Sequence, residues 1–317
     1  MVIRALITGA TGFAGGHLVE ECLAAGYEVV GTSLSPIPAT GGLAAVTLCQ
    51  CDLGRLEDVE ALVAEARPDR VFHLAGQAAV GAAWNDPAGT FAANVFLTQH
   101  VLEAVHRHAP AARVLAVGSG EVYGAVDPAR MPVVEAEPFR PLNPYGVSKA
   151  AADLLALQYF LAFDLQVVRV RPFNHIGPRQ RQGFVLADFA AQVAAIERGE
   201  APPVLATGNL EAARDFTDVR DVARAYRLAL ELGTPGAVYN VCSGQPTPIG
   251  ALLDALLHAS RVPVRVETDP ALYRPVDRPE IFGSNAALQA ATGWQPRIPL
   301  NQSVVDTLTY WRAEPHA

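Results

Sequence analysis

Lysine is almost absent from this 317-residue chain. Of the 24 basic residues, Lys149 is the single lysine and the other 23 are arginines. The two residue types are not interchangeable, because lysine carries a compact ammonium on a flexible stem and arginine a planar fork of donors. The exception at position 149 therefore indicates a place that needs an ammonium.

Cysteine is scarce as well, with four residues in the chain. Cys49 and Cys51 form a C-x-C pair, whereas Cys22 and Cys242 stand alone in apolar segments. This spacing fits neither a zinc site nor a redox motif. We expect no metal site, and thiols that are reduced and mostly buried.

Long apolar runs and an excess of positive charge are also missing. No run approaches the roughly 18 residues that a membrane span needs, and the N-terminus has no cleavable signal pattern. The formal net charge is -8, and a nucleic-acid surface would need a basic stripe. We therefore expect a cytoplasmic protein with no membrane or nucleic-acid partner.

The chain is rich in short apolar runs that alternate with Ala- and Leu-rich stretches. This alternation is typical of βα units and predicts a Rossmann-type, doubly wound parallel sheet in an α/β fold. The predicted strands are residues 2–8, 27–32, 70–74, 113–117, 166–171 and 237–242, and the predicted helices are 15–25, 56–66, 91–107 and 145–162.

The texture changes after Pro172, where Gly, Pro and Asn interrupt shorter elements. We predict a dinucleotide-binding domain over residues 1–172, to which about 218–244 return as a further strand of the sheet. Residues 173–217 and 245–317 are predicted to form a smaller α/β substrate-binding domain.

A glycine-rich turn follows the first predicted strand. Gly9, Gly12 and Gly15 have the spacing G-x-x-G-x-x-G, which lets a backbone approach a pyrophosphate at a helix N-terminus. The second strand ends at Ser33 without the acid that would bind a ribose 2′-hydroxyl, which favours NADPH and leaves NADH open. Asp52, next to Leu53, is either an adenine contact or an acid at a helix N-terminus.

Tyr145 and Lys149 form an i, i+4 pair on one face of a predicted helix. The ammonium is expected to lower the phenol pKa and so suit it to proton transfer. Ser119 follows a predicted strand at the sheet edge where doubly wound folds bind ligands, and its hydroxyl can bond the reacting oxygen.

These motifs resemble the extended short-chain dehydrogenase/reductase family over essentially the whole chain. The resemblance lies in the glycine turn and in residues 73–77, 119–124 and 145–149. Residues 171–178, 214–219 and 238–245 resemble the GDP-4-dehydro-6-deoxy-D-mannose reductases within that family.

The resemblance implies hydride transfer from NADPH or NADH to C4 of a GDP-linked keto-deoxy sugar, giving GDP-D-rhamnose. Tyr145 would donate the proton, Lys149 would bind the nicotinamide ribose and Ser119 would polarise the carbonyl. Implied cofactor contacts are Gly9, Thr11, Gly12, Phe13, Gly15, Ser33, Asp52, Leu53, Leu74, Ala75, Gln77, Asn94, Val117, Tyr145, Lys149, Pro172, Phe173 and Ile176. Implied substrate contacts are Ser119, Glu121, Tyr145, Asn174, Val185, Asn209, Arg214, Arg274 and Asp277.

Glu121 leaves the reaction type open. Related sugar-nucleotide 4,6-dehydratases carry a glutamate at this position as their elimination base, so a GDP-mannose 4,6-dehydratase or a nucleotide-sugar 4-epimerase is the alternative to a reductase. A third hypothesis is an inactive dinucleotide-binding regulator. The resemblance also implies a homodimer through helices near 91–107 and 145–162.

Overall fold

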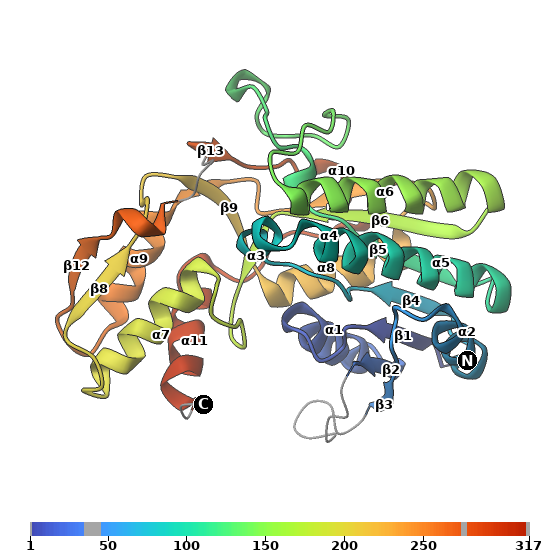
Figure 1. Ribbon diagram of the computed structural model, residues 1–317, viewed down its shortest axis with the longest axis horizontal. Coiled ribbons are helices and arrows are strands. Elements are labelled where there is room, and N and C mark those ends of the chain that lie inside the picture. Colours follow the sequence, from blue (N-terminus) through green and yellow to red (C-terminus); the bar gives the residue numbers. More distant parts are fainter. Residues whose placement is uncertain (1, 35–45, 274–277, 315–317) are drawn as a thin grey trace.

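A seven-stranded parallel sheet forms the larger part of the molecule (Figure 1). The computed structural model describes residues 2–34, 46–273 and 278–314. The strand order is β10-β6-β5-β4-β1-β2-β3, which is the doubly wound Rossmann order with one added strand. This confirms the predicted fold class. The strands are β1 (Arg4–Thr8), β2 (Glu28–Ser33), β3 (Thr47–Gln50), β4 (Arg70–His73), β5 (Arg113–Val117), β6 (Gln166–Pro172) and β10 (Val238–Val241).

Helices cover both faces of this sheet because its strands are apolar on both sides. On β1, Ala5 and Ile7 face α1 (Phe13–Ala24) and α8 (Val219–Leu232), while Leu6 faces α2 (Leu56–Ala66) and α5 (Leu97–His108). Helix α6 (Pro144–Phe163) packs beside α5 and against β6 (Figure 1). Three of the four cysteines are buried, as predicted.

The predicted helix 91–107 is interrupted. It consists of α4 (Pro87–Phe91), a π-helical turn (Ala92–Phe96) and α5, preceded by the short α3 (Val80–Asn85). Within the described residues, short 3₁₀ helices also occur at Gly120–Val122, Pro128–Arg130 and Pro270–Leu272.

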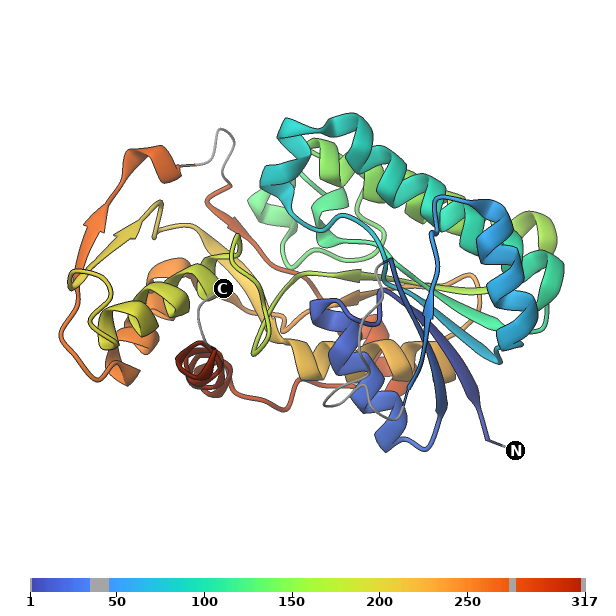
Figure 2. The same ribbon diagram turned by 60° about the horizontal axis from the view of Figure 1, so that its bottom comes forward.

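The smaller part has its own apolar core and two small sheets. Figure 2 shows it beside the large sheet rather than stacked on it. Strand β9 pairs with β7, β11 and β13, and β8 pairs with β12. The elements are β7 (Asn174–Ile176), α7 (Val185–Glu197), β8 (Val204–Thr207), β9 (Ala213–Asp218), β11 (Pro246–Pro248), α9 (Ile249–Ala259), β12 (Arg265–Thr268), β13 (Glu280–Ile281) and α11 (Leu300–Ala313).

One segment packs differently from the predicted division of the chain. Helix α10 (Ala286–Thr292) was assigned to the smaller domain, yet it packs against α8 and β10. Leu288 and Trp294 are fully buried in the core beneath the large sheet. The remaining domain boundaries stay a prediction.

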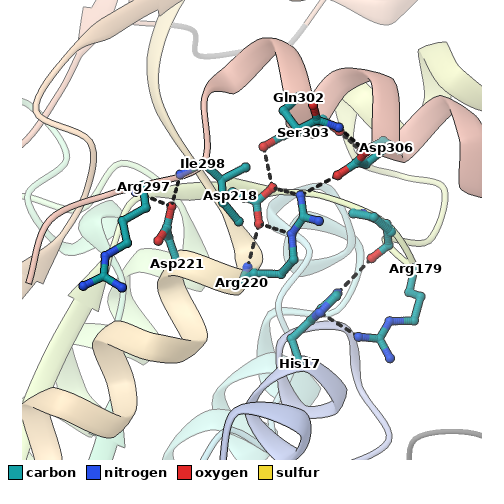
Figure 3. Close-up of polar contacts among 12 residues, drawn as sticks. His17, Arg179, Asp218, Arg220, Asp221, Arg297, Ile298, Gln302, Ser303 and Asp306 are labelled. Atoms are coloured by element: carbon teal, nitrogen blue, oxygen red, sulfur yellow. Dashed lines mark hydrogen bonds and ion pairs between the residues drawn. The ribbon is translucent and has the colours of Figure 1, made fainter. Parts of the chain in front are cut away.

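The first turn of α8 ties the two parts together (Figure 3). Asp218 caps this helix by accepting from the Arg220 amide at 2.8 Å, and it also accepts from the Arg220 side chain at 2.7 Å. Arg220 reaches Asp306 of α11 at 2.7 Å. Asp221 accepts from the amides of Arg297 and Ile298, which precede α11.

A second tie joins α1 to the loop after β7. His17 of α1 contacts the carbonyl of Pro178 at 3.1 Å, and Arg179 donates to His17 Nδ1 at 2.6 Å (Figure 3). Arg179 also pairs with Glu20 at 2.7 Å. These two sets of contacts fix how the smaller part lies beside α1.

In the three described ranges, no helix combines the length and the apolar character that crossing a membrane requires.

Candidate active site

The turn between β1 and α1 needs glycine at two of its positions. Gly9 has φ +69°, and a Cβ there would lie 3.0 Å from the Ala75 amide nitrogen. A Cβ on Gly15 would lie 2.0 Å from the Gly9 carbonyl oxygen. The strand order reverses between β1 and β4, and Gly9 directly follows β1 while Ala75 is the second residue after β4. Ligands of doubly wound folds bind at this switch point.

The N-terminus of α1 fits the pyrophosphate of a dinucleotide. Gly12 is the N-cap, and within the described chain no side chain caps the helix. Thr11 and Gly12 are exposed, so amides of the first turn are open to an anion. Gln77, on the loop after β4, has a buried Oε1 that no described residue contacts by a hydrogen bond. Open amides at a helix N-terminus and a buried acceptor without a protein partner on the neighbouring loop both fit a bound dinucleotide.

Asn94 connects the loop after β4 to α6. It is buried in the π-helical turn, where its Oδ1 accepts from the Gln77 amide at 3.0 Å. Its Nδ2 donates to Ser148 Oγ at 2.9 Å, and Ser148 donates to the Tyr145 carbonyl at 2.8 Å. Asn94 was predicted as a cofactor contact, and in the structure its amide orients the residues on either side.

The other predicted cofactor residues lie in several environments. Leu74 and Ala75 donate their amides to Thr8 Oγ1 beside the glycine turn. Asp52 is exposed and closes a turn by accepting from the Gly54 amide. Further residues are buried or partly buried: Ser33 at the end of β2, Val117 at the end of β5, Leu53 in the α2/α5 core, Pro172 at the end of β6, Phe173 against Gly120, and Ile176 in the core of the smaller part.

Tyr145, Lys149 and Ser119 meet at the carboxyl edge of the large sheet. Ser119 follows β5, and Tyr145 and Lys149 lie on the buried face of α6. Lys149 Nζ donates to the Val117 carbonyl at 3.0 Å, and the side chains of Ser119 and Tyr145 are hydrogen-bonded. The three residues that sequence patterns singled out therefore come together in one site.

Burial dominates the pKa values of this pair. Desolvation raises the pKa of Tyr145 to about 12, although the Ser119 hydrogen bond opposes the rise and the Glu121 charge adds to it. Desolvation lowers the pKa of Lys149 to about 8. The expected lowering of the tyrosine pKa was wrong, because loss of hydration disfavours the charged form of each residue.

Buried ion pairs fix the helix that carries Tyr145 and Lys149. Asp153 lies four residues after Lys149 on the same face, and it accepts from Arg169 at 2.7 Å and from Arg171 at 2.9 Å. Both arginines belong to β6, at alternate positions that face α6. Sequence reasoning missed this contact, although two arginines in an otherwise apolar strand were its signal.

Glu121 is held by partners from two sides. Its Oε1 pairs with Arg278 Nη2 at 2.6 Å, and its Oε2 accepts from Asn143 Nδ2 at 2.9 Å. Asn143 is also the N-cap of α6, where its Oδ1 accepts from the Gly146 amide. Arg278 was not predicted, since no local pattern relates it to position 121.

The predicted substrate contacts are only partly placed. Asn174 is exposed on β7, Val185 begins α7, and Asn209 closes a turn by accepting from the Glu211 amide. Arg214 is buried on β9 and donates to the Arg278 carbonyl at 2.8 Å. Arg274 and Asp277 lie outside the described residues.

His73 is part of the scaffold of the site. It contacts Thr8 Oγ1 at 2.8 Å and Thr98 Oγ1 at 3.1 Å. Thr98 donates onward to the Asn94 carbonyl, so the histidine accepts from Thr8 and donates to Thr98. Burial and the nearby Lys149 charge lower the pKa of His73 to about 3, which keeps the ring neutral.

Comparison with known proteins places this site in a family. Residues 6–307 match the model described as GDP-mannose 4,6 dehydratase. GDP-6-deoxy-D-mannose reductase of Pseudomonas aeruginosa is 38% identical over 313 residues, which cover 99% of this chain and 98% of that protein. A solved structure of RMD from Pseudomonas aeruginosa complexed with NADPH has a TM-score of 0.86 and 37% identity, covering 98% of this chain and 99% of that one. The UDP-glucose 4-epimerase of Thermus thermophilus in complex with NAD has a TM-score of 0.86 and 30% identity, with coverages of 98% and 99%.

Proposed function

The chain belongs to the GDP-mannose 4,6 dehydratase family of extended short-chain dehydrogenases, and from this membership we propose that it reduces GDP-4-dehydro-6-deoxy-D-mannose to GDP-D-rhamnose. The observation that carries the proposal is full-length similarity to a GDP-6-deoxy-D-mannose reductase, with Ser119, Tyr145 and Lys149 gathered in one site. The cofactor is a nicotinamide dinucleotide, NADPH or NADH.

The residues of the site divide the work of reducing a ketone. When bound, the nicotinamide supplies a hydride to C4. Ser119 and Tyr145 hold the carbonyl oxygen, and Tyr145 donates its proton as that oxygen becomes an alkoxide. A phenol whose pKa burial raises to about 12 begins the reaction protonated, as a proton donor must. Lys149, one helical turn away, stabilises the phenolate that remains.

The glycine turn and the first turn of α1 would hold the dinucleotide. Gly9 and Gly15 allow the turn to pack closely against Ala75 and against the start of α1, and amides from Gly12 onward would bind the pyrophosphate oxygens. Ser33 ends β2 without an acid that would repel a 2′-phosphate, which supports NADPH, and the similar structure in complex with NADPH supports it too.

The test supplies purified protein with GDP-4-dehydro-6-deoxy-D-mannose and either reduced cofactor. We expect NADPH oxidation, followed at its absorbance, and GDP-D-rhamnose identified by NMR. Tyr145→Phe should lower turnover by a factor of about 10² or more while cofactor binding persists. Oxidation of neither cofactor would refute the reductase, and cofactor binding without any turnover would favour the inactive regulator.

A dehydratase remains the second candidate because Glu121 lies two residues after Ser119 and its charge acts on Tyr145. Such an enzyme would consume GDP-mannose without added reductant. Incubation of the protein with GDP-mannose and oxidised cofactor, followed by NMR, separates the two reactions. The pairing of Glu121 with Arg278 favours the reductase.

The chain is also proposed to act as a homodimer through α5 and α6. Val147, Leu154 and Leu161 recur every seven residues on α6 and are exposed in the single chain. Phe91 and Phe96 of the neighbouring helices are exposed too. This apolar face is suited to pairing with its own copy. The predicted cytoplasmic location stays a prediction.

A further inference from the structure

A carboxylate beside the substrate ketone can catalyse a side reaction in a reductase. C–H bonds next to a carbonyl are acidic, and a carboxylate that reaches one acts as a general base. Glu121 follows Ser119 by two residues, and its amide donates to Ser119 Oγ at 3.1 Å. Ser119 and Tyr145 are proposed to hold the carbonyl oxygen of the substrate. Glu121 is the acidic residue nearest in sequence to Ser119.

Both oxygens of Glu121 are occupied by donors. Arg278 and Asn143 bind one oxygen each, at 2.6 and 2.9 Å. The side chains of Arg278 and Glu121 are only 16% and 22% exposed. A charge-assisted hydrogen bond is stronger than one between neutral groups, and here it occupies a lone pair with which the carboxylate would take a proton.

The partners of Glu121 are themselves fixed. Arg278 Nη1 donates to the Gly124 carbonyl at 2.9 Å, and the Arg278 carbonyl accepts from Arg214 at 2.8 Å. Asn143 is held by its capping bond to Gly146. Arg278 comes from the segment leading into β13. The smaller part of the molecule therefore supplies the cation that pairs with Glu121.

We propose that Arg278 determines the reaction type by keeping Glu121 from removing a proton next to the C4 ketone. The suppressed step would break a C–H bond flanking C4, move the proton to the Glu121 carboxylate and leave the electron pair as an enolate on the carbonyl oxygen. Return of a solvent proton would then exchange or invert that carbon. Arg278 acts through Glu121, and the inference rests on the proposed substrate of this site.

Deuterium exchange measures the suppressed step without hydride transfer. The protein is incubated in D₂O with GDP-4-dehydro-6-deoxy-D-mannose and NADP⁺, and deuterium at the carbons flanking C4 is followed by NMR and mass spectrometry. The wild-type chain should exchange at the background rate of the free sugar. Arg278→Gln should raise the exchange rate about tenfold or more, because it frees the base.

Three further variants identify the group responsible. The double variant E121Q/R278Q should return to background, since no carboxylate remains at position 121. Arg278→Lys keeps a cation, is less disruptive to folding, and should exchange at a rate between wild type and R278Q. Arg312→Gln is a matched control, because Arg312 is 18% exposed and pairs with Glu197 at 2.7 Å far from Ser119 in the α7/α11 contact. It should leave exchange at background.

Background exchange in R278Q that still binds the sugar would overturn the proposal, as would exchange that persists in E121Q/R278Q. If R278Q fails to fold, R278K decides alone: exchange at the wild-type level contradicts the proposal, and exchange above it supports the proposal. NADPH oxidation by the wild-type chain is measured separately. Its absence would refute the proposed reduction, whereas the exchange rates report on Arg278 alone.

Discussion

At the scale of single residues, the site depends on two ionisable groups buried on one helix face. Tyr145 and Lys149 both lose hydration in the fold. The pKa of Tyr145 rises and that of Lys149 falls, so each shift favours the neutral form of its side chain. For Tyr145 the shift preserves the proton that reduction consumes. For Lys149, burial makes the charged ammonium costly, and the lowered pKa reflects that cost. Lysine is used at this buried position although the other 23 basic residues of the chain are arginines.

The cost at Lys149 predicts how stability depends on pH. The ordinary pKa of 10.5 falls to about 8 in the fold, so between these values the unfolded chain binds more protons than the native one. Native stability should therefore rise with pH in this window, by on the order of 3 kcal/mol in total. Below pH 8 both states carry the ammonium and the full penalty remains.

The measurement is urea unfolding of wild type and Lys149→Met from pH 7 to 10.5. The wild-type chain should gain stability relative to the variant as pH rises above 8, because the methionine side chain does not titrate. A difference between the two chains that is constant over this range would contradict the lowered lysine pKa.

At the scale of elements, α6 is positioned by charge as well as by apolar packing. Asp153 is nearly fully buried and neutralises one of two buried arginines, Arg169 and Arg171. Arg171 is further held by Tyr123 Oη at 3.0 Å and lies over the Phe139 ring. These contacts set the position of α6 along β6, and with it the position of Tyr145 at the sheet edge.

Removing the Asp153 carboxylate should therefore weaken the packing of α6 on β6 and destabilise the fold. Asp153→Ala leaves two buried guanidinium groups without their acid, which costs about 3–5 kcal/mol of unfolding free energy. Asp58→Ala is the matched control, because Asp58 pairs with Arg55 at 3.9 Å on the surface and such pairs contribute about 0–1 kcal/mol. Chemical unfolding of both variants decides: equal losses would show that Asp153 does not anchor α6.

The same elements show what a single sequence can predict. Six strands of the large sheet were predicted because buried parallel strands are short apolar runs, and Ser119, Tyr145 and Lys149 because each has a local pattern. The π-helical turn at Ala92–Phe96 carries no such pattern, since nothing in the sequence Ala-Ala-Asn-Val-Phe distinguishes a π-helical turn from an α-helical one. Arg278 is 157 residues from Glu121, and a pairing over that distance is fixed by the fold and not by periodicity.

The return of α10 to the large sheet was missed for the same reason. Ala286–Thr292 is a short helix, and nothing local distinguishes a helix that packs on α8 from one that packs on α9. Trp294, fully buried just after it, was the available signal, because a tryptophan at the end of a short helix needs a large core. The core beneath α8 provides one, and Trp294 Nε1 donates to the Asp221 carbonyl at 3.0 Å.

At the scale of the whole molecule, the catalytic helix has two faces with different tasks. The buried face carries Tyr145, Lys149 and Asp153, and the opposite face carries Val147, Leu154 and Leu161. Spacing of seven residues keeps these three in line along the helix. A dimer formed on this face would bury apolar area while each chain keeps a complete set of Ser119, Tyr145 and Lys149.

Leu154→Glu tests this arrangement, because it places a charge in the middle of the apolar face and a buried unpaired charge opposes association. Sedimentation velocity should show a dimer for wild type and a monomer for the variant. Leu232→Glu is the matched control, since Leu232 at the end of α8 is 56% exposed against 55% for Leu154 and lies on another surface. A wild-type monomer, or a dimer that survives L154E, would contradict the proposed interface.

Because the catalytic side chains all come from one chain, the monomeric variant should keep its turnover per chain. Lost turnover would mean that pairing itself supports the position of α6.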